Sequence, residues 1–475
     1  MPDFAPFELK MRAAGQPELA IVNFREAWEG LVHGATGLVP ESSIVPVPGL
    51  PDLADLDGFI IQGEQELPHT VIIKLNGGLG TSMGMERAKS LLPVKEGRTF
   101  LDLIVEQVLS VRQTHHVPMP LVLMDSFRTQ ADCQAALAGN IALMAGQSDL
   151  PTTFLQHQVP KVRARDLAPA EHADDELTWC PPGHGDLYLS IATSGLLDRL
   201  LARGFRWAFV SNADNLGAVP DLALLGWMAA TGKAFVMECC DRTPADKKGG
   251  HLALRAGPAG GYLLREVAQC PPEHLAYFQD IKRHRYFNTN NLWVDLRAVR
   301  ALLDARGGRL GLPVIKNVKP LDPASPSGPE HPDNEPVIQL ETAMGAAIER
   351  FADLGDYGVG AVRVGRHRFA PVKTTNDLLV LWSDVFVRDD DGRVEVIPER
   401  RGDLPLVELD PAFFKTIDDF QSRFPAGAPS LVKCKRLVVR GDVRFESDVR
   451  VVGDVVIEHT GPGQRVVARG SVVEG

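Results

Sequence analysis

The chain has 475 residues, of which 44% are hydrophobic and 23% are charged, the composition of an ordinary globular protein of two or three domains. A formal net charge of −11 argues against a nucleic-acid-binding surface and requires that any anionic substrate be held by local lysines and backbone dipoles. The N-terminus has charged residues where a signal peptide needs an apolar core, and no apolar run reaches about 18 residues. We therefore expect a cytoplasmic protein without membrane contact. Six cysteines lack C-x-x-C spacing and are expected to be reduced thiols.

Residues 1–66 are predicted to form an N-terminal helical and irregular segment, with a helix near Glu18–Leu31 and a Pro-rich connector from Val39 to Pro51. From residue 67 to 385, short apolar strands alternate with amphipathic helices. The predicted strands are Val71–Leu75, Leu121–Met124, Ala208–Ser211, Ala234–Glu238 and Leu292–Asp295, and the predicted helices are Phe100–Thr114, Gln130–Ala145, Thr193–Arg203 and Ala218–Thr231. This alternation predicts an α/β fold with a mixed, mainly parallel sheet that binds ligands at the carboxyl ends of its strands.

The first predicted strand stops at Asn76-Gly77-Gly78-Leu79-Gly80, and Lys89 follows. Closely spaced glycines after a buried strand present backbone N–H groups that a phosphate can approach. A Walker A loop is excluded, because no glycine here is followed by Lys and then Ser or Thr. The glycines 78, 80 and 84 give G-x-G-x-x-x-G, one residue too long for a dinucleotide fingerprint. The alternative to a phosphate site is a tight turn that binds nothing.

Two further loops carry polar groups suited to a nucleotide. Trp179–Asp186 is rich in Pro and Gly, so it predicts a fixed loop against a flat ligand with His184 as a donor, or a structural turn capped by Asp186. The segment Phe209–Asn215 ends a strand in a carboxylate flanked by amides. Asp214 is a candidate Mg²⁺ ligand, because that ion is commonly held by one carboxylate plus substrate phosphates; the alternative is an Asx-turn.

Two segments of the second half suit a sugar phosphate. Phe287–Leu292 places four polar side chains before an apolar strand, which suits sugar hydroxyls or, equally, a solvent-exposed turn. Arg368–Thr375 places Lys373 in an extended, stiff segment, where the alternative is an exposed lysine of an edge strand. Between them, Pro320–Pro336 contains six prolines and is predicted to be a loop.

The tail changes character after a connecting segment at 386–430. Leu437, Val443, Val449 and Val455 recur every six residues, and Gly441-Asp442 returns as Gly453-Asp454. A six-residue period favours a short left-handed parallel β-helix over residues 431–475; an antiparallel hairpin is the alternative. Its open end would pack on the main domain or join subunits into a homo-oligomer.

Taken together, the motifs LNGGLGTSMG, AKS, PPGHGD, SNADNLGA, KKGG, FNTNNLW, IQLETAMGAAI and RFAPVKTTNDLL closely resemble the eukaryotic-type UTP–glucose-1-phosphate uridylyltransferase family. The resemblance runs from about Lys74 to the end of the chain. It implies a Rossmann-like nucleotidyltransferase domain of the GT-A-like type, with UTP, glucose 1-phosphate, UDP-glucose and pyrophosphate as ligands and Mg²⁺ as cofactor.

The resemblance also implies a role for each matching position. The residues matched to UTP contacts are Leu75, Asn76, Gly77, Gly78, Lys89, Gln156, Gly183, Asp214 and Lys373. Those matched to the sugar phosphate and ribose are His184, Asn212, Ala213, Asp214, Gly250, Glu266 and Asn290. Asp214 matches the metal ligand, Lys373 the lysine regarded as catalytic, and Lys89 a lysine that meets the phosphates.

This assembly suits in-line attack of a sugar phosphate oxygen on the α-phosphorus of UTP without a covalent enzyme intermediate. Between Gly84 and Lys89 the chain reads Met85-Glu86-Arg87-Ala88, where the family usually has a lysine and a proline; this departure bears on UTP affinity. Alternatives are a uridylyltransferase for N-acetylglucosamine 1-phosphate or several sugar phosphates, and a non-catalytic sensor of sugar nucleotides. A trimeric acyltransferase, suggested by the hexapeptide tail alone, is excluded because so few coils cannot build an acyl-donor site.

Overall fold

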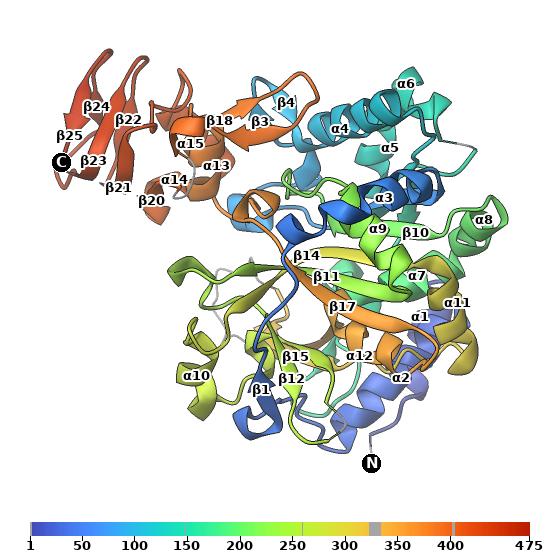
Figure 1. Ribbon diagram of the computed structural model, residues 1–475. Coiled ribbons are helices and arrows are strands. Elements are labelled where there is room, and N and C mark those ends of the chain that lie inside the picture. Colours follow the sequence, from blue (N-terminus) through green and yellow to red (C-terminus); the bar gives the residue numbers. More distant parts are fainter. Residues whose placement is uncertain (1, 148, 259, 323–333, 401–403) are drawn as a thin grey trace.

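The computed structural model describes residues 2–147, 149–258, 260–322, 334–400 and 404–475. A mixed sheet crosses its centre (Figure 1), with β6 (Thr153–Leu155), β5 (Leu121–Asp125), β2 (Thr70–Asn76) and β10 (Trp207–Asn212) as parallel neighbours. The long strand β14 (Tyr286–Asp295) runs antiparallel to β10 and to β11 (Lys233–Asp241), and β11 pairs in parallel with β17 (Gly358–Arg363). The α/β fold and all five predicted strands are confirmed.

Both faces of the sheet are buried, and successive residues of one strand point to opposite faces. On β2, Ile72 packs into one apolar core while Val71 and Ile73 pack into the other. The first core also contains α4 (Phe100–His115), α9 (Leu222–Ala230) and α13 (Thr375–Trp382). The second contains α1 (Ala5–Ala13), α2 (Glu18–Val32), α7 (Leu187–Thr193), α8 (Leu196–Ala202), α11 (Leu296–Ala305) and α12 (Ala347–Ala352). This layering explains why the strands read as continuous apolar runs.

Three predicted helices have wrong boundaries. In each, a capping or left-handed residue marks the boundary that the structure shows. The predicted helix Gln130–Ala145 divides into α5 (Gln130–Ala138) and α6 (Ile141–Ala145), because Asn140 leaves the helix to cap α6 through its side chain. The helix predicted from Thr193 begins at Leu196, after Gly195 in the left-handed region. The helix predicted from Ala218 begins at Leu222, where Asp221 accepts from the Leu224 N–H. The predictions at α2 and α4 are confirmed.

The polar run before the last predicted strand is part of β14 itself, so the expectation of a solvent-exposed turn is wrong. The pairing of β14 with β11 shifts register between Met237 and Cys239, opposite this run. Asn290 has a φ of 59° there, a left-handed conformation that asparagine tolerates better than most residues. A bulge of this kind redirects side chains out of the regular alternation of the strand.

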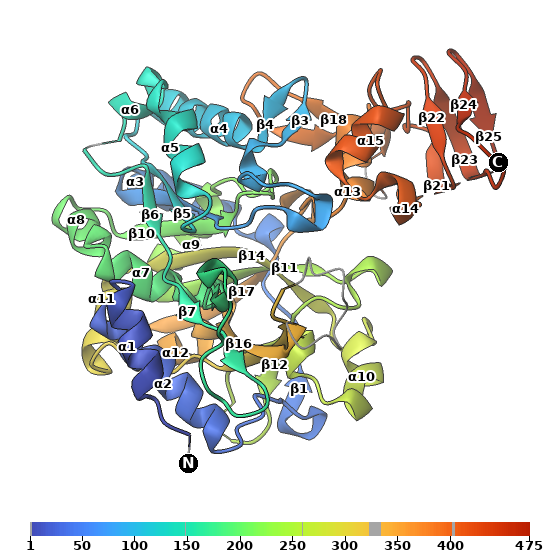
Figure 2. The same cartoon turned by 180° about the vertical axis from the view of Figure 1, so that it is seen from behind.

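The N-terminal segment joins the main sheet. Strand β1 (Ile44–Pro46) pairs with β12 (His251–Arg255), and α3 (Ile60–Glu66) packs against α9. Helices α1 and α2 lie at the opposite end of the molecule from the C-terminal tail, as Figure 2 shows. Strands β15 (Val314–Pro320) and β16 (Pro336–Thr342) bracket the predicted Pro-rich loop, most of which lies outside the described residues. No helix in the described ranges has the length and apolar character needed to cross a membrane.

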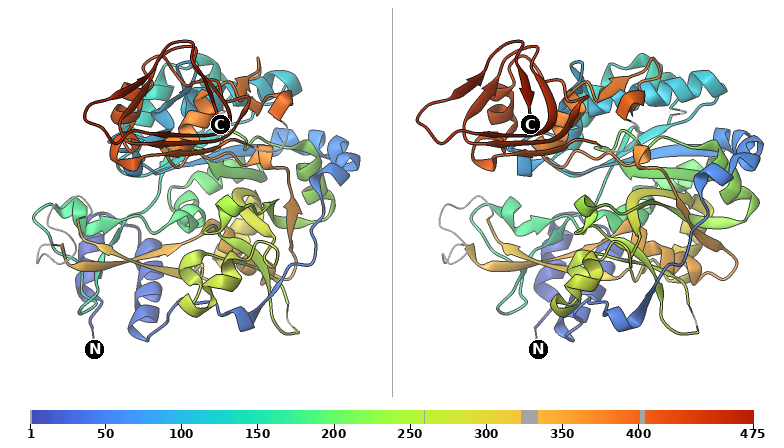
Figure 3. Two further views of the ribbon diagram at one scale, coloured as in Figure 1. Left: turned by 90° about the vertical axis from the view of Figure 1, so that its left-hand side faces the viewer. Right: turned by 60° about the vertical axis from the view of Figure 1, so that its left-hand side comes forward.

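The tail consists of parallel strands stacked on one another (Figure 3), so the alternative of an antiparallel hairpin is wrong. Strand β21 (Cys434–Arg440) pairs with β23 (Arg450–Glu458), and Leu437 aligns with Val455. Both side chains are buried. An offset of three six-residue repeats separates these partners along the chain, which explains the sequence period. Along the edge opposite to β23, β21 pairs in parallel with β20 (Leu406–Leu409).

The contact between α3 and α9 yields a test of packing. A Cβ on Gly226 would lie 2.0 Å from the Phe59 carbonyl oxygen and 2.6 Å from the Gly63 nitrogen. We expect Gly226→Ala to lower the free energy of unfolding by about 3 kcal/mol, because backbone atoms cannot move aside cheaply. In the control Gly30→Ala, the new Cβ meets only the Ala35 Cβ at 3.8 Å, and helix propensity should raise stability by up to about 1 kcal/mol. Urea unfolding of both variants measures this, and equal midpoints would contradict it.

Candidate functional site

A cavity of about 460 Å³ opens at the carboxyl ends of β2, β5 and β10. It brings together most residues that the sequence predicted for one site. The predicted residues on its wall are Leu75, Asn76, Gly77, Gly78, Lys89, Gln156, Gly183, His184, Asn212, Ala213 and Asp214. They come from five separate segments of the chain, so the structure confirms that these segments meet.

The register of the parallel strands explains why the segments meet. Leu75 on β2 aligns with Asn212 on β10, and Asn76 aligns with Asp125 on β5. The glycine loop after β2 and the Asp214 loop after β10 therefore leave the sheet at the same level and on the same edge.

Residues 77–80 of the glycine loop line the cavity. The carbonyl of Gly77 accepts from the Ser126 hydroxyl at 2.9 Å, and that of Gly78 accepts from the Lys89 N–H at 3.1 Å. These two hydrogen bonds fix the carbonyl oxygens of Gly77 and Gly78, and they therefore fix the orientation of the two peptide groups. Among the described residues, the N–H groups of Gly78, Leu79 and Gly80 donate to no protein acceptor. Gly80 has a φ of 70°, the left-handed conformation that such a concave set of donors uses to bind anions.

Beneath the loop, the buried Asn76 side chain is clamped between two partners. Its Nδ2 donates to Asp125 Oδ1 at 2.7 Å and to Cys133 Sγ at 2.9 Å. Asp125 is fully buried, and its second oxygen has no hydrogen-bond partner. Burial therefore raises the pKa of Asp125 to about 7, although the bond from Asn76 opposes this shift. The amide of Asn76 thus fixes the loop from below.

Two segments form the wall expected to read the base. The Gln156 side chain lies against the loop so closely that a Cβ on Gly77 would be 3.0 Å from its Oε1. Gly183 has a φ of 83°, and a Cβ there would lie 2.4 Å from the Thr342 carbonyl oxygen. Only glycine fits at this second position. The Thr342 N–H also donates to the Pro182 carbonyl at 2.9 Å, so β16 supports the loop from behind.

His184 is held as a neutral imidazole. The Met344 N–H donates to its Nδ1 at 3.0 Å, which leaves the proton on Nε2. Burial lowers the pKa of His184 to about 4, so the ring remains neutral and offers Nε2–H as a donor. Asp186 does not cap the following helix through its side chain, which corrects that alternative; its carboxylate accepts from the His157 N–H at 2.7 Å.

Lys89 joins three segments at the floor of the cavity. Its Nζ lies 2.5 Å from Asp214 Oδ2 and also donates to the Val372 carbonyl. The side chains of Lys89 and Asp214 are 16% and 19% exposed, so this ion pair is partly shielded from water but open to the cavity. Lys373 follows Val372 and is itself exposed.

Three of the residues matched to the sugar phosphate, Gly250, Glu266 and Asn290, are not on the lining of the main cavity and belong to a separate cluster. A Cβ on Gly250 would lie 2.5 Å from Glu266 Oε1, and the Gly250 carbonyl accepts from the Asn288 N–H at 3.1 Å. Asn288 Nδ2 donates to Asn290 Oδ1 at 2.8 Å. Burial raises the pKa of Glu266, and the positive charge of Lys373 partly offsets this shift. Lys373 is therefore within electrostatic reach of this cluster.

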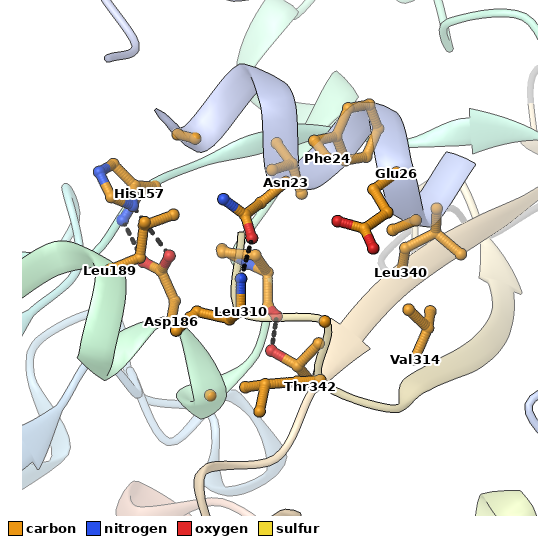
Figure 4. Close-up of a pocket in the computed structure, with 17 residues that line it drawn as sticks. Asn23, Phe24, Glu26, His157, Asp186, Leu189, Leu310, Val314, Leu340 and Thr342 are labelled. Carbon is orange, nitrogen blue, oxygen red and sulfur yellow. Dashed lines mark hydrogen bonds and ion pairs between the residues drawn. The ribbon is translucent and has the colours of Figure 1, made fainter. Parts of the chain in front are cut away.

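A second cavity, of about 250 Å³, is shown in Figure 4. It is lined in part by the loop Pro182–Gly185, which in the sequence includes His184. Its walls are mostly apolar side chains of α2, including Phe24, and of β16, including Leu340. Pro182, Gly185 and Thr342 also line it, so the same short loop separates the two cavities.

Sequence reasoning missed the supports of the site. Asp125, Ser126 and Thr342 contact the predicted residues directly, but each reads as an ordinary strand or turn residue. Only the position of Asp125 at the end of a predicted strand gave a signal, since polar residues at such ends gather at one edge of the sheet.

Comparisons with known proteins agree with this geometry. The sequence profile of the family described as UTP--glucose-1-phosphate uridylyltransferase matches residues 39–451. A probable UTP--glucose-1-phosphate uridylyltransferase of Schizosaccharomyces pombe is 39% identical over 406 residues, which are 85% of this chain and 76% of the relative. The Saccharomyces cerevisiae UTP--glucose-1-phosphate uridylyltransferase is 39% identical over 413 residues, or 86% of this chain and 77% of the relative.

Solved structures are similar over nearly the whole chain. The UDP-glucose phosphorylase of Trypanosoma brucei superposes with a TM-score of 0.89 at 41% identity, covering 99% of this chain and 98% of its own. A point mutant of the Leishmania major UDP-glucose pyrophosphorylase, solved in complex with UDP-glucose, gives a TM-score of 0.88 at 40% identity, with coverage of 99% and 98%.

The buried carboxyl of Asp125 predicts a pH-dependent stability. Its pKa is about 7 in the fold against an ordinary value of 3.8, so the folded state holds its proton more tightly than the unfolded state does. The protonated Asp125 therefore makes its full contribution to the free energy of unfolding when the pH is below the pKa of Asp125 in the unfolded chain. This contribution is lost as the pH rises towards 7. Asp125→Asn keeps an oxygen for Asn76 but cannot titrate. Between about pH 5 and pH 8, we expect the free energy of unfolding to fall by about 1–4 kcal/mol more in the unaltered protein than in this variant.

Urea unfolding at several pH values measures that difference. Substitution of the exposed Asp304 by Asn is the control and should leave the pH dependence unchanged. Parallel curves for the unaltered protein and Asp125→Asn would contradict the assignment of the titration to Asp125.

Proposed function

The chain belongs to the UTP–glucose-1-phosphate uridylyltransferase family, and from this premise we propose that it transfers the uridylyl group of UTP to glucose 1-phosphate. The observation that carries the proposal is one cavity lined both by the glycine loop and by the ion pair of Lys89 and Asp214. The N–H groups of Gly78, Leu79 and Gly80 in this loop donate to no acceptor among the described residues. Such a cavity offers donors to a chain of phosphates and a carboxylate to an accompanying cation.

In the proposed reaction, a phosphate oxygen of glucose 1-phosphate attacks the α-phosphorus of UTP in line. A new P–O bond forms, the bond between the α-phosphorus and the bridging oxygen breaks, and pyrophosphate leaves with both electrons of that bond. The attacking phosphate is already ionised, so no general base and no covalent enzyme intermediate are needed. The chain must align the two phosphates and stabilise the charge that spreads over the α-phosphate oxygens.

We assign the roles as the sequence motifs imply. The Leu75–Gly78 backbone, Gln156 and Gly183 hold UTP, together with Lys89, Asp214 and Lys373. Lys89 and Lys373 are also the cations that stabilise the α-phosphate of the uridylyl group during transfer. The residues assigned to the sugar phosphate and ribose are His184, Asn212, Ala213, Asp214, Gly250, Glu266 and Asn290. The neutral Nε2–H of His184 suits this role, because it donates a hydrogen bond without adding charge.

The site also fits Mg²⁺ as the cofactor. Within the described ranges, no three acidic, His or Cys side chains gather into a metal site of their own. Asp214 offers one oxygen-donor carboxylate at the edge of the phosphate cavity, which is the donor set that Mg²⁺ uses when substrate phosphates supply other ligands. When bound, the ion would neutralise charge on the phosphates. Asp214 would hold it, and Lys89 already pairs with the same carboxylate.

We further propose that the tail is a left-handed parallel β-helix and that its open end serves a homo-oligomer. Strand β25 (Val472–Glu474) pairs with β23 on one side, and Val456, Val466 and Val472 are exposed. We retain the boundaries at residues 66, 385 and 430 as proposed divisions between the N-terminal segment, the catalytic domain, the connecting segment and the tail.

The first test of the function is pyrophosphate release from UTP and Mg²⁺ with three sugar phosphates. We expect rapid turnover with glucose 1-phosphate and much slower turnover with galactose 1-phosphate and N-acetylglucosamine 1-phosphate, because buried polar groups left unpaired by the wrong sugar are costly. Preference for another sugar would keep the reaction type and change the substrate. Folded protein that binds UTP but turns over none of the three would be a sensor and not an enzyme.

The second test concerns Lys373. We expect Lys373→Met to lower kcat by about 100- to 1,000-fold, by analogy with the removal of one donor from an oxyanion hole. Lys435, which is exposed on the tail, is the matched control, and Lys435→Met should retain full activity. Steady-state kinetics with a thermal unfolding check measures both. Near-normal kcat in a folded Lys373→Met variant would remove this lysine from the catalytic role.

A further inference from the structure

A buried ion pair lies behind the two loops that carry Asp214 and Lys373. Glu238 lies on β11, and Arg368 is the last residue of the short turn Arg366–Arg368 that precedes Lys373. The Arg368 guanidinium binds both carboxylate oxygens, with Nε 2.8 Å from Oε2 and Nη2 2.7 Å from Oε1. The two side chains are 4% and 0% exposed. This bidentate geometry fixes the direction of both groups.

The carboxylate of Glu238 has its remaining acceptor positions filled. Asn291 Nδ2 donates to Oε2 at 3.0 Å, and Trp293 Nε1 donates to Oε1 at 3.0 Å. Each oxygen therefore receives two hydrogen bonds from rigid groups of β14 and Arg368. A carboxylate saturated in this way leaves Arg368 one well-defined position.

Asn215 connects this pair to the loop that carries Asp214. Its Nδ2 donates to the Arg368 carbonyl at 3.0 Å, and its Oδ1 accepts from the Ala370 N–H at 3.0 Å. The Val372 N–H donates to the Asp214 carbonyl at 3.3 Å. The residues after Asp214 and those before Lys373 are thus joined side by side.

The far end of the same segment is fixed independently. The N–H groups of Lys373 and Thr374 both donate to Asp377 Oδ2 at 2.8 Å, in the capping box that begins α13. The backbone of Lys373 is therefore held from both sides, although its side chain is exposed.

We propose that Glu238, Arg368 and Asn215 are positioning residues that set the spacing between Asp214 and Lys373, an inference that rests on the proposed function of those two groups. A buried ion pair often adds little net stability compared with apolar residues, because burying two charges offsets their attraction. Its bidentate geometry, in contrast, is specific. A displacement of about 1 Å of a reacting group can cost about 100-fold in rate, so the spacing has a direct catalytic consequence.

The test uses Arg368→Lys, which keeps the charge but loses the fork, and Asn215→Ala, which leaves the buried ion pair intact. We expect each to lower kcat by about 100-fold while the KM for UTP changes by less than about threefold, because most of the residues assigned to UTP, namely those of the glycine loop, Gln156 and Gly183, are untouched. Hydrogen exchange should show faster exchange in residues 369–373. Arg206→Lys is the matched control, because Arg206 forms an ion pair with Asp295 at 2.9 Å at the other end of β10. The kcat of this control variant should be unchanged.

Two outcomes would overturn the proposal. One is a variant in which residues 369–373 exchange faster than in the unaltered protein and which nevertheless keeps a kcat within about threefold of the unaltered protein's kcat. The other is a loss of kcat that matches the loss of thermal stability equally in Arg368→Lys and Arg206→Lys. If the unaltered protein shows no turnover, the proposed function fails; exchange in residues 369–373 then still decides whether Arg368 and Asn215 anchor the segment.

Discussion

Strands β2 and β10 are parallel neighbours in a register that aligns Leu75 with Asn212, and the site depends on this pairing more than on any single side chain. Parallel strands that end at one level deliver their loops to one edge. A shift of one residue would turn the side chains of each strand to the opposite face and move the two loops apart. Both faces of these strands are buried in large apolar cores, so any such shift would place side chains of the wrong size and shape in both closely packed cores. The geometry of the cavity at this edge of the sheet is therefore protected by the hydrophobic core.

Beneath this edge the core contains a buried lysine that makes hydrogen bonds to other buried groups. Lys74, on β2, is 2% exposed and donates to the Ser211 hydroxyl at 2.8 Å and to the Ala218 carbonyl at 2.9 Å. Burial, together with the charge of the neighbouring Arg368, lowers the pKa of Lys74 to about 7 against the opposing effect of Glu238 and Asp214. Lys74 thus binds both ends of the segment that contains Asp214. Together with Asn215, it makes that segment rigid where an isolated Asx-turn would leave it free to move.

The strands, the glycine loop and the loop of Asp214 could be predicted from the sequence because each leaves a local signal, whereas Gln156 is matched only through the family resemblance. Apolar runs that end in glycine or in a carboxylate identify the edge of a sheet, and Gly77, Lys89 and Asp214 were located in this way. The supports leave no such signal. Glu238 and Trp293 look like ordinary residues of apolar strands, and their contact depends on the pairing of β11 with β14.

The predicted helix boundaries near Asn140 and Gly195 are wrong for a different reason. Capping and left-handed residues interrupt helices without interrupting the apolar period of the sequence. The hexad period of the tail predicted parallel stacking, because partners such as Leu437 and Val455 recur at a multiple of six.

The charges around the cavity constrain how an anion can enter it. Lys89 and Asp214 are the charged side chains on its described lining, and they neutralise each other at 2.5 Å. The overall charge of −11 opposes a polyanion at long range. Under the proposed function, attraction of the anion therefore rests on the N–H groups of the glycine loop, which act only at short range. A cation that pairs with Asp214 would leave the Lys89 ammonium to the anion, because the carboxylate then no longer needs it. The ion pair of Lys89 and Asp214 thus makes the site more favourable to an anion that arrives with its own cation than to the anion alone.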